Sequence, residues 1–266
     1  MITVADLADL AGRTAVITGG AGHLGRTIAR TLLAANCSVA LVDKYAGPLE
    51  VAKNELNLAG GAGVTTYLAD LENEEARVEV ARGILNCCNV DILINNAGFV
   101  GDSALKGWTT NFANQSLETW RRAIEVNLTA PFHLTQLFYD SLARTGKGSV
   151  VNISSIYGLL GPNMTLYEGT SMGNPAAYAA SKGGLIQLTR WLATTMAPHV
   201  RVNSITPGGI ERGQPESFAE RYVSLTPMAR MGKEEDFMGP LLLLASDQSS
   251  WMTGQNIIVD GGWSAW

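Results

Sequence analysis

The chain has 266 residues, a length that fits one large α/β domain better than two small ones. Hydrophobic residues make up 46% and charged residues 16%, so the chain can bury a sizeable core without disulfides or structural metals. The formal net charge of −5 gives no reason to expect a nucleic acid or an anionic membrane as a partner.

Short runs rich in β-branched residues alternate with longer amphipathic segments. The predicted strands span 14–18, 38–43, 64–68, 90–95, 149–154, 200–205 and 256–259. The predicted helices span 24–35, 46–59, 72–86, 117–143, 177–197 and 233–246. Most strands are nearly continuous apolar runs, as expected when helices cover both faces of a parallel sheet. The pattern predicts a single α/β domain over residues 1–266, with a seven-stranded, mainly parallel, doubly wound sheet flanked by helices.

Three long segments interrupt this alternation: 99–116, 156–176 and 207–230. The first two directly follow strand ends, and the third is predicted to form a short helical lid. Because ligands bind at the carboxyl ends of the strands in such sheets, we expect these segments to surround a substrate. The alternative is that they are tolerated surface insertions.

The three cysteines, Cys37, Cys87 and Cys88, have a spacing that predicts neither a disulfide framework nor a zinc site, so no metal is expected. The first residues carry Asp6 and Asp9 and no basic stretch, which argues against a signal peptide. No apolar run approaches the roughly 18 residues of a membrane span. We therefore expect a cytoplasmic protein with reduced thiols and no membrane partner.

A glycine-rich loop with the sequence TGGAGHLG follows the first strand over residues 18–25, and a helix is predicted directly after it. Glycines there permit a tight turn and let the backbone approach a pyrophosphate, whose charge the helix N-terminus attracts. A purely structural strand–helix turn would look the same. The residues expected to contact a dinucleotide here are Gly19, Gly22, His23, Leu24 and Gly25.

Asp43 ends the second predicted strand, 18 residues beyond Gly25. A carboxylate at this place accepts hydrogen bonds from ribose hydroxyls and repels a 2′-phosphate, which favours NAD over NADP. The following Lys44 would partly offset that repulsion, and the alternative is that Asp43 only caps a loop. Asp70, after the third strand, is expected either at the adenine edge or at the N-terminus of the next helix.

Tyr178 and Lys182 lie one turn apart on the same face of a predicted helix. A free tyrosine has a pKa of about 10. A lysine cation and an oxidised nicotinamide would lower that pKa and let the phenol accept a proton. Ser155 would hold the substrate oxygen. Asn127, unusual inside a helix, would hold a water that links Lys182 to solvent, or would be a polar surface residue or a helix kink.

With these motifs in this order along the sequence, the chain resembles the short-chain dehydrogenase/reductase family over nearly its whole length. The matching segments are 18–25, 70–71, 95–98, Asn127, 153–155, Tyr178 with Lys182, 201–204, 207–208, 245–247 and 253–262. The resemblance implies a Rossmann-type sheet, the catalytic residues Asn127, Ser155, Tyr178 and Lys182, and commonly a homotetramer. By position, Ser155 rather than Ser154 is the catalytic serine. The further cofactor contacts that it implies are Asp43, Asp70, Leu71, Asn96, Ala97, Gly98, Tyr178, Lys182, Pro207, Gly208 and Ile210.

The chain departs from the family pattern at three places. His23 replaces a glycine of the loop, where it would contact phosphate or only fill space. Arg212 stands where the family often has a threonine beside the nicotinamide. The interval between Ser155 and Tyr178 is longer than usual. Tyr167 lies nearer the usual interval, but a serine rather than a lysine follows it four residues later, so Tyr178 is preferred.

The extra residues of this interval lie in the segment 156–176, which we call the insertion. The insertion is polar and aromatic, which suits a hydroxyl-rich, sugar-like small molecule as substrate. The insertion and the tail 261–266 also resemble a bacterial subgroup associated with surface-sugar or flagellin modification. The sequence thus predicts an NAD(P)-dependent oxidoreductase that moves a hydride between nicotinamide and a secondary alcohol or ketone. Two alternatives stay open, a non-catalytic dinucleotide-binding sensor or scaffold and a sugar epimerase or dehydratase that regenerates its own cofactor.

Overall fold

Seven parallel strands form the central sheet in the computed structural model, which describes residues 2–58, 63–101 and 105–266. Their order across the sheet is β3-β2-β1-β4-β5-β6-β7. Every neighbouring pair in the described residues is parallel, so the predicted doubly wound sheet is confirmed, and it is wholly parallel. The strands are β1 (Thr14–Thr18), β2 (Ser38–Asp43), β3 (Val64–Leu68), β4 (Ile92–Asn95), β5 (Gly148–Ile153), β6 (Val200–Pro207) and β7 (Asn256–Val259).

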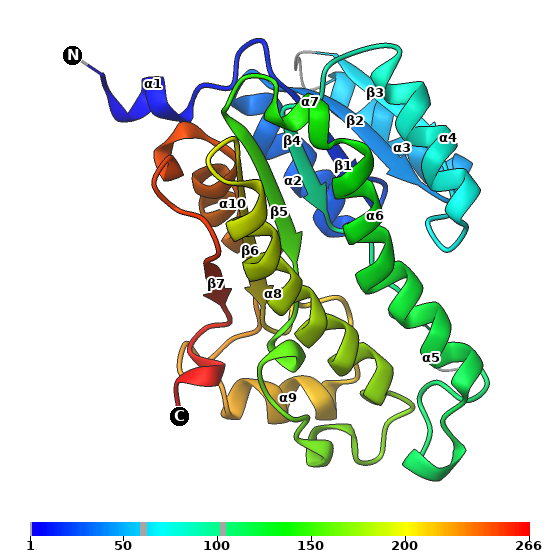
Figure 1. Cartoon of the computed structure of the whole chain (residues 1–266). Helices are drawn as coiled ribbons and strands as arrows, with labels where there is room; N and C mark the ends of the chain where they lie inside the picture. The colour runs from blue at the N-terminus through cyan, green and yellow to red at the C-terminus, as the bar shows by residue number, and fades with distance from the viewer. Residues whose placement is uncertain (1, 59–62, 102–104) are drawn as a thin grey trace.

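Helices cover both faces of this sheet (Figure 1). One core contains side chains of α2 (His23–Ala34), α3 (Ala46–Leu58) and α10 (Met238–Ala245). The opposite core contains side chains of α4 (Glu74–Leu85), α6 (Ala130–Leu137) and α8 (Ala176–Met196). Neighbouring residues of β1 pack in different cores. Ile17 packs in the first core and Val16 in the opposite one. Burial on both faces explains why the strands are continuous apolar runs.

The chain reverses its direction across the sheet at β1. From β1 it proceeds through β2 to the edge strand β3 and then returns to place β4 on the other side of β1. A crevice at such a reversal, outside the carboxyl ends of the strands, is where doubly wound sheets bind ligands. The arrangement therefore places the expected site beyond the ends of β1 and β4.

The predicted helix over 117–143 is present, but the structure divides it into shorter segments. The chain forms α5 (Leu117–Ile124), a π-helical turn (Glu125–Thr129), α6 and α7 (Tyr139–Ala143). Pro131 has no N–H to donate to the carbonyl of Asn127, four residues earlier. The N–H of Ala130 instead bonds the carbonyl of Glu125, five residues earlier. This wide turn carries Asn127 into the interior.

Two shorter helices complete the fold. The predicted helical segment within 207–230 is α9 (Glu216–Ser224), which lies with the loop 156–176 at the carboxyl end of the sheet (Figure 1). The sequence did not predict α1 (Val4–Ala8), whose first turn Thr3 caps. Residue 59 of the predicted helix 46–59 and residues 102–104 of the loop 99–116 lie outside the described residues. No helix within the described ranges is long and apolar enough to cross a membrane.

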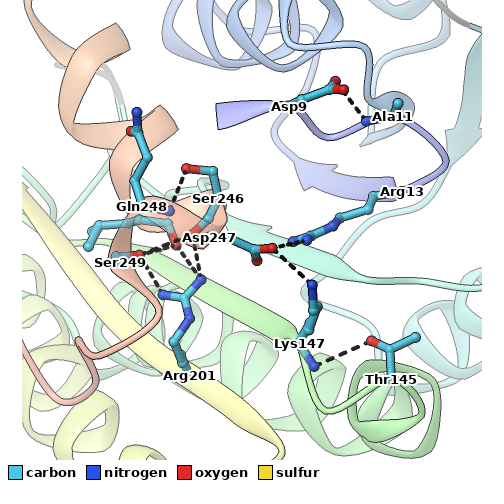
Figure 2. Close-up of polar contacts among 11 residues, drawn as sticks. Asp9, Ala11, Arg13, Thr145, Lys147, Arg201, Ser246, Asp247, Gln248 and Ser249 are labelled. Atoms are coloured by element: carbon cyan, nitrogen blue, oxygen red, sulfur yellow. Dashed lines mark hydrogen bonds and ion pairs between the residues drawn. The ribbon is translucent and has the colours of Figure 1, made fainter. Parts of the chain in front are cut away.

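A polar cluster joins the amino ends of the strands, opposite the expected site (Figure 2). The Asp247 carboxylate accepts hydrogen bonds from Arg13, just before β1, at 2.7 Å and from Lys147, just before β5, at 3.1 Å. Arg201 of β6 donates to Ser249 at 2.6 Å and to two main-chain carbonyls. Burial lowers the pKa of Arg201 to about 10. This value is still well above neutral pH, so Arg201 stays charged. Arg201 and Asp247, which lie in segments that match the family pattern, therefore stabilise the fold.

The Asp247 cluster should make stability depend on pH. Burial acts to raise the pKa of Asp247, but hydrogen bonds from Arg13 and Lys147 outweigh it and hold the pKa below 3.8. Since the folded pKa lies below the unfolded one, the stabilisation is present above about pH 4 and is lost as the pH falls through the folded value. We expect Asp247→Asn to lower the free energy of unfolding by about 1–2 kcal/mol at neutral pH and less in acid.

Urea unfolding at a series of pH values measures this effect. Glu79→Gln is the matched control, because Glu79 is exposed and forms no ion pair within the described residues. This control should change the free energy of unfolding by less than about 0.5 kcal/mol. Equal losses for the two variants, or a loss for Asp247→Asn that does not shrink in acid, would contradict the assignment.

Candidate active site

Two adjoining cavities open at the carboxyl ends of the strands. The larger, of about 700 Å³, is lined by the loop after β1 and by the ends of β2, β4 and β5. The smaller, of about 240 Å³, is lined by parts of the segments 156–176 and 207–230. Ser155 and Tyr178 are among the residues that line both cavities. These two side chains therefore lie where the contents of the two cavities would meet.

The glycine-rich loop forms one wall of the larger cavity with a closely packed backbone. Gly19 has a φ of +63°, and a Cβ placed on it would lie 2.9 Å from the Cα of Ala97. A Cβ on Gly25 would overlap the carbonyl oxygen of Gly19 and lie 2.9 Å from the Cα of Gly20. The end of this loop, residues 23–25, already forms the first turn of α2, whose N–H groups have no partner inside the helix. This bare backbone at a helix N-terminus fits the pyrophosphate of a dinucleotide.

Asp43 lies at the end of β2, beside that loop, and lines the larger cavity. One carboxylate oxygen accepts a hydrogen bond from the N–H of Ala21 in the glycine-rich loop at 3.2 Å. The other accepts one from the N–H of Lys44 at 2.8 Å. The Lys44 ammonium lies 5.2 Å from the centre of the Tyr45 ring. Asp43 thus presents a negative charge to the cavity and also orders the glycine-rich loop.

Asp70 lies on the wall of the same cavity. Its carboxylate accepts a hydrogen bond from the N–H of Glu72 at 3.0 Å. The residue that caps α4 is Asn73, whose side chain accepts from the N–H of Ala76 at 2.8 Å. The alternative that Asp70 caps this helix is therefore wrong.

Asn96 connects the end of β4 to the end of β1. Its side chain donates to the carbonyls of Thr18 at 2.9 Å and Gly19 at 3.1 Å, and the Thr18 hydroxyl accepts from the N–H groups of Asn96 and Ala97 at 3.0 Å. These bonds fix the crevice between the two strands. Of the expected cofactor contacts, the structure places all on the wall of the larger cavity: Gly19, Gly22, His23, Leu24, Gly25, Asp43, Asp70, Leu71, Asn96, Ala97, Gly98, Tyr178, Lys182, Pro207, Gly208 and Ile210.

Lys182 is buried against the end of β5. Its ammonium donates to the carbonyl of Ile153 at 2.8 Å and lies 5.9 Å from the centre of the Tyr178 ring. Burial lowers the pKa of Lys182 to about 8. The Ser154 hydroxyl donates to the carbonyl of Lys182 at 2.9 Å and so joins β5 to α8. Of the two serines, only Ser155 lines both cavities.

Burial raises the pKa of the Tyr178 phenol, and a hydrogen bond with Ser155 and the charge of Arg212 act in the opposite direction. The expected lowering of this pKa by Lys182 is therefore wrong for the protein side chains by themselves, because loss of hydration outweighs their polar contacts. The other cause in that expectation, the positive charge of an oxidised nicotinamide, belongs to the cofactor.

Asn127 lies in the interior beside Lys182. A Cβ placed on Gly98 would lie 3.8 Å from the Asn127 side-chain oxygen and 3.9 Å from the Lys182 ammonium. The Asn127 amide exchanges two hydrogen bonds with the main chain of Phe99, at 2.6 and 3.3 Å, and donates to the Ser181 hydroxyl at 3.0 Å. The surface alternative is therefore wrong. In place of a regular α-helical turn, Asn127 sits in the π-helical turn.

Most aromatic residues of the smaller cavity were not predicted from the sequence. They come from separate segments and include Trp108, Tyr157, Phe218 and Tyr222. The Tyr222 hydroxyl accepts from the N–H of Gly209 at 2.6 Å, and its ring stacks on Trp263 with centres 4.3 Å apart. The spacing of Phe218 and Tyr222 on one face of α9 is the only local signal, and it does not reveal what that face covers.

The glycine-rich loop, the buried Lys182 and the placement of Tyr178 agree with one known family. The profile described as short chain dehydrogenase matches residues 13–220. The chain belongs to the short-chain dehydrogenase family. It is an NAD(P)-dependent oxidoreductase that acts on CH–OH groups, and the family does not favour the alternative of a non-catalytic sensor or scaffold.

Relatives match the chain over nearly its whole length. A galactitol 2-dehydrogenase (L-tagatose-forming) from Cereibacter sphaeroides is 32% identical, with 97% of each chain covered. A 3-oxoacyl-(acyl-carrier-protein) reductase from Thermotoga maritima is 33% identical, over 95% of this chain and 98% of the other. The crystal structure of a protein from Beutenbergia cavernae, described as an NAD(P)-dependent gluconate 5-dehydrogenase and holding NADP at low occupancy, is 33% identical with a TM-score of 0.86. That match covers 98% of this chain and 100% of the other.

A methyl group at Gly25 should disrupt the glycine-rich loop. Because its Cβ would overlap backbone atoms, we expect Gly25→Ala to lower the free energy of unfolding by about 1–3 kcal/mol. We also expect a loss of dinucleotide affinity of about tenfold or more, since the loop must shift. The control is Gly47→Ala in α3, where a Cβ meets nothing within 4 Å. It should stabilise the fold by up to about 1 kcal/mol. Denaturant unfolding and NADH fluorescence titration measure both quantities, and normal NADH affinity in Gly25→Ala would contradict the prediction.

Proposed function

We propose that this enzyme moves a hydride between NAD and a secondary alcohol or ketone of a small, polyol-like or sugar-like molecule. The observation that carries the proposal is the position of Ser155 and Tyr178, which line both the dinucleotide-sized cavity and the smaller one. A substrate in the smaller cavity would therefore present its oxygen to the phenol and to the serine hydroxyl at the boundary with the larger cavity.

The protein side chains bind and move the proton of the reacting oxygen. The Ser155 hydroxyl holds that oxygen by a hydrogen bond, and the Tyr178 phenol takes the proton during oxidation or returns it during reduction. A nicotinamide held in the larger cavity would supply the hydride chemistry, and the positive charge of its oxidised form would favour the phenolate of Tyr178. Lys182 keeps a cation beside the phenol, because a pKa of about 8 leaves it mostly protonated at neutral pH.

Asn127 contributes to the proton path through its main-chain carbonyl. Its side chain is bonded to Phe99 and Ser181, which fixes the π-helical turn next to Lys182. Its carbonyl lacks the usual donor four residues later, since that residue is Pro131. This carbonyl is thus suited to accept a hydrogen bond from a water that carries protons between Lys182 and solvent.

The preference for NAD rests on Asp43. Its carboxylate lines the larger cavity at the end of β2, where it would accept hydrogen bonds from ribose hydroxyls and repel a 2′-phosphate. The ammonium of Lys44, the residue that would partly offset this repulsion, lies 5.2 Å from the centre of the Tyr45 ring. The Beutenbergia structure contains NADP, so the preference is a property that we assign to this chain from its own residues.

The polyol-like substrate rests on the smaller cavity and on the relatives. The names of two relatives refer to galactitol, a neutral polyol, and to gluconate, a hydroxylated carboxylate, and we take the neutral polyol as the guide. We also propose a cytoplasmic homotetramer. Exposed apolar side chains on α5, α6 and α8, namely Trp120, Phe132 and Trp191, support the assembly because they are suited to burial between subunits.

Removal of the phenolic hydroxyl tests the proposed chemistry. We expect Tyr178→Phe to reduce kcat by about 10²–10⁴-fold, because the proton loses its acceptor, while NADH affinity changes less than about threefold. Tyr139→Phe, at an exposed position of α7, is the control and should behave as the wild type. The assay follows NADH absorbance with galactitol and related polyols. Full activity of Tyr178→Phe would disprove the role, and substrate conversion without net NADH change would favour the epimerase or dehydratase alternative.

Replacement of the Asp43 charge tests the cofactor preference. We expect the wild type to bind NADH at least about tenfold more tightly than NADPH, and Asp43→Asn to reduce that ratio about tenfold because the repulsion of the 2′-phosphate is lost. The ratio is the relevant quantity, since any loosening of the glycine-rich loop affects both dinucleotides alike. Fluorescence titration measures both, and an unchanged ratio would refute the assignment.

A further inference from the structure

Two tyrosines of the insertion form a pair in the wall of the smaller cavity. The hydroxyls of Tyr157 and Tyr167 lie 2.6 Å apart, a short hydrogen bond. Burial is the main cause that raises the pKa of both phenols, so both stay protonated at neutral pH. Two phenols carry two protons, and the bond between them uses one. The pair therefore has one O–H left to donate, next to the place where a substrate would bind.

Asn174 adds an unused acceptor to the same wall. Its side-chain oxygen is buried and has no hydrogen-bond partner in the described residues. The Asn174 side chain also lies against the Tyr167 hydroxyl and acts to lower the pKa of that phenol. A buried amide oxygen without a partner carries a desolvation penalty that a bound ligand can relieve. An O–H donor and an amide acceptor side by side match a hydroxyl group, which both donates and accepts.

The rest of the wall disfavours a charged substituent. Within the described residues, the smaller cavity is lined by no Asp, Glu, Lys or Arg, and much of its surface comes from Trp108, Met172, Phe218 and Met231. Arg212, whose charge influences Tyr178, lines the larger cavity and donates to Glu234 at 3.1 Å. A carboxylate or phosphate in the smaller cavity would thus lose its hydration without gaining a counter-charge.

The insertion is held in place by α9. One nitrogen of Arg221 donates to the carbonyls of Thr165 and Leu166, both at 3.3 Å, and of Glu168 at 2.6 Å. The Tyr167 ring packs against Phe218 of the same helix, with ring centres 5.4 Å apart. The tyrosine pair is therefore positioned before a substrate arrives, which reduces the entropy cost of recognition.

We propose that Tyr157, Tyr167 and Asn174 form a specificity-determining subsite that binds a second, uncharged hydroxyl of the substrate. Ser155 and Tyr178 hold the reacting oxygen, and the subsite holds the second hydroxyl across the smaller cavity. This inference rests on the proposed function, because it concerns the substrate of the same reaction. It narrows the substrate class to small neutral diols, polyols and hydroxyketones.

Probes that differ by one group test the subsite. The panel is cyclohexanol, the 1,2-, 1,3- and 1,4-cyclohexanediols and 3-hydroxycyclohexanecarboxylate, each assayed for kcat/KM with NAD. For the wild type we expect the best diol to exceed cyclohexanol at least about tenfold, and the carboxylate to fall below that diol. Tyr167→Phe and Asn174→Leu should each lower kcat/KM for the diol about 10–100-fold and leave that for cyclohexanol within about threefold, because cyclohexanol has no second hydroxyl. Tyr139→Phe is the control and should change neither value.

The outcomes separate this inference from the function on which it rests. Activity on cyclohexanol also reports whether each variant is folded. If the wild type oxidises cyclohexanol without preferring any diol, if the variants keep the preference, or if they lose activity equally on both alcohols, the subsite is wrong and the hydride transfer stands. Preference for the carboxylate would refute an uncharged subsite. Oxidation of no probe by the wild type would count against the proposed function and this inference together.

Discussion

The site depends on the buried bonds that join Lys182 to the end of β5. The lysine ammonium donates to the carbonyl of Ile153, and the Ser154 hydroxyl donates back to the carbonyl of Lys182. These reciprocal bonds hold α8 against the strand end. Tyr178 lies one turn earlier on that helix, and Ser155 directly follows Ser154 in the chain. The same two bonds therefore fix Tyr178 and Ser155, to which we assign the catalysis, at the boundary between the two cavities.

Burial of these groups has an energetic cost. It favours the neutral form of both Lys182 and Tyr178, which lowers the pKa of the first and raises that of the second. Perturbed groups of this kind are typical of sites whose chemistry needs them, and other parts of the molecule must supply the stability. Here the two apolar cores and the polar cluster around Asp247 do so, and that cluster lies at the opposite end of the strands.

Features with a local cause could be predicted from the sequence. The strands are apolar runs because both faces of the sheet are buried, and the glycine-rich loop and the pair of Tyr178 and Lys182 are contiguous patterns. Features that arise from tertiary packing could not. The direction of the Tyr178 pKa depends on burial, and the aromatic wall of the smaller cavity gathers residues from distant segments. The π-helical turn could be predicted only in part. Pro131 indicates a missing N–H donor in the sequence, but it does not determine how the helix adapts to that loss.

Asp43 has a consequence for how this enzyme can evolve. Its carboxylate holds the N–H groups of Ala21 and Lys44 as well as facing the larger cavity. If Asp43 excludes a phosphorylated dinucleotide, as we propose, its loss would admit the 2′-phosphate and would also remove the carboxylate acceptor of the Ala21 and Lys44 N–H groups. New acceptors would have to arise first or at the same time. A change of cofactor preference at Asp43 is therefore coupled to the order of the glycine-rich loop.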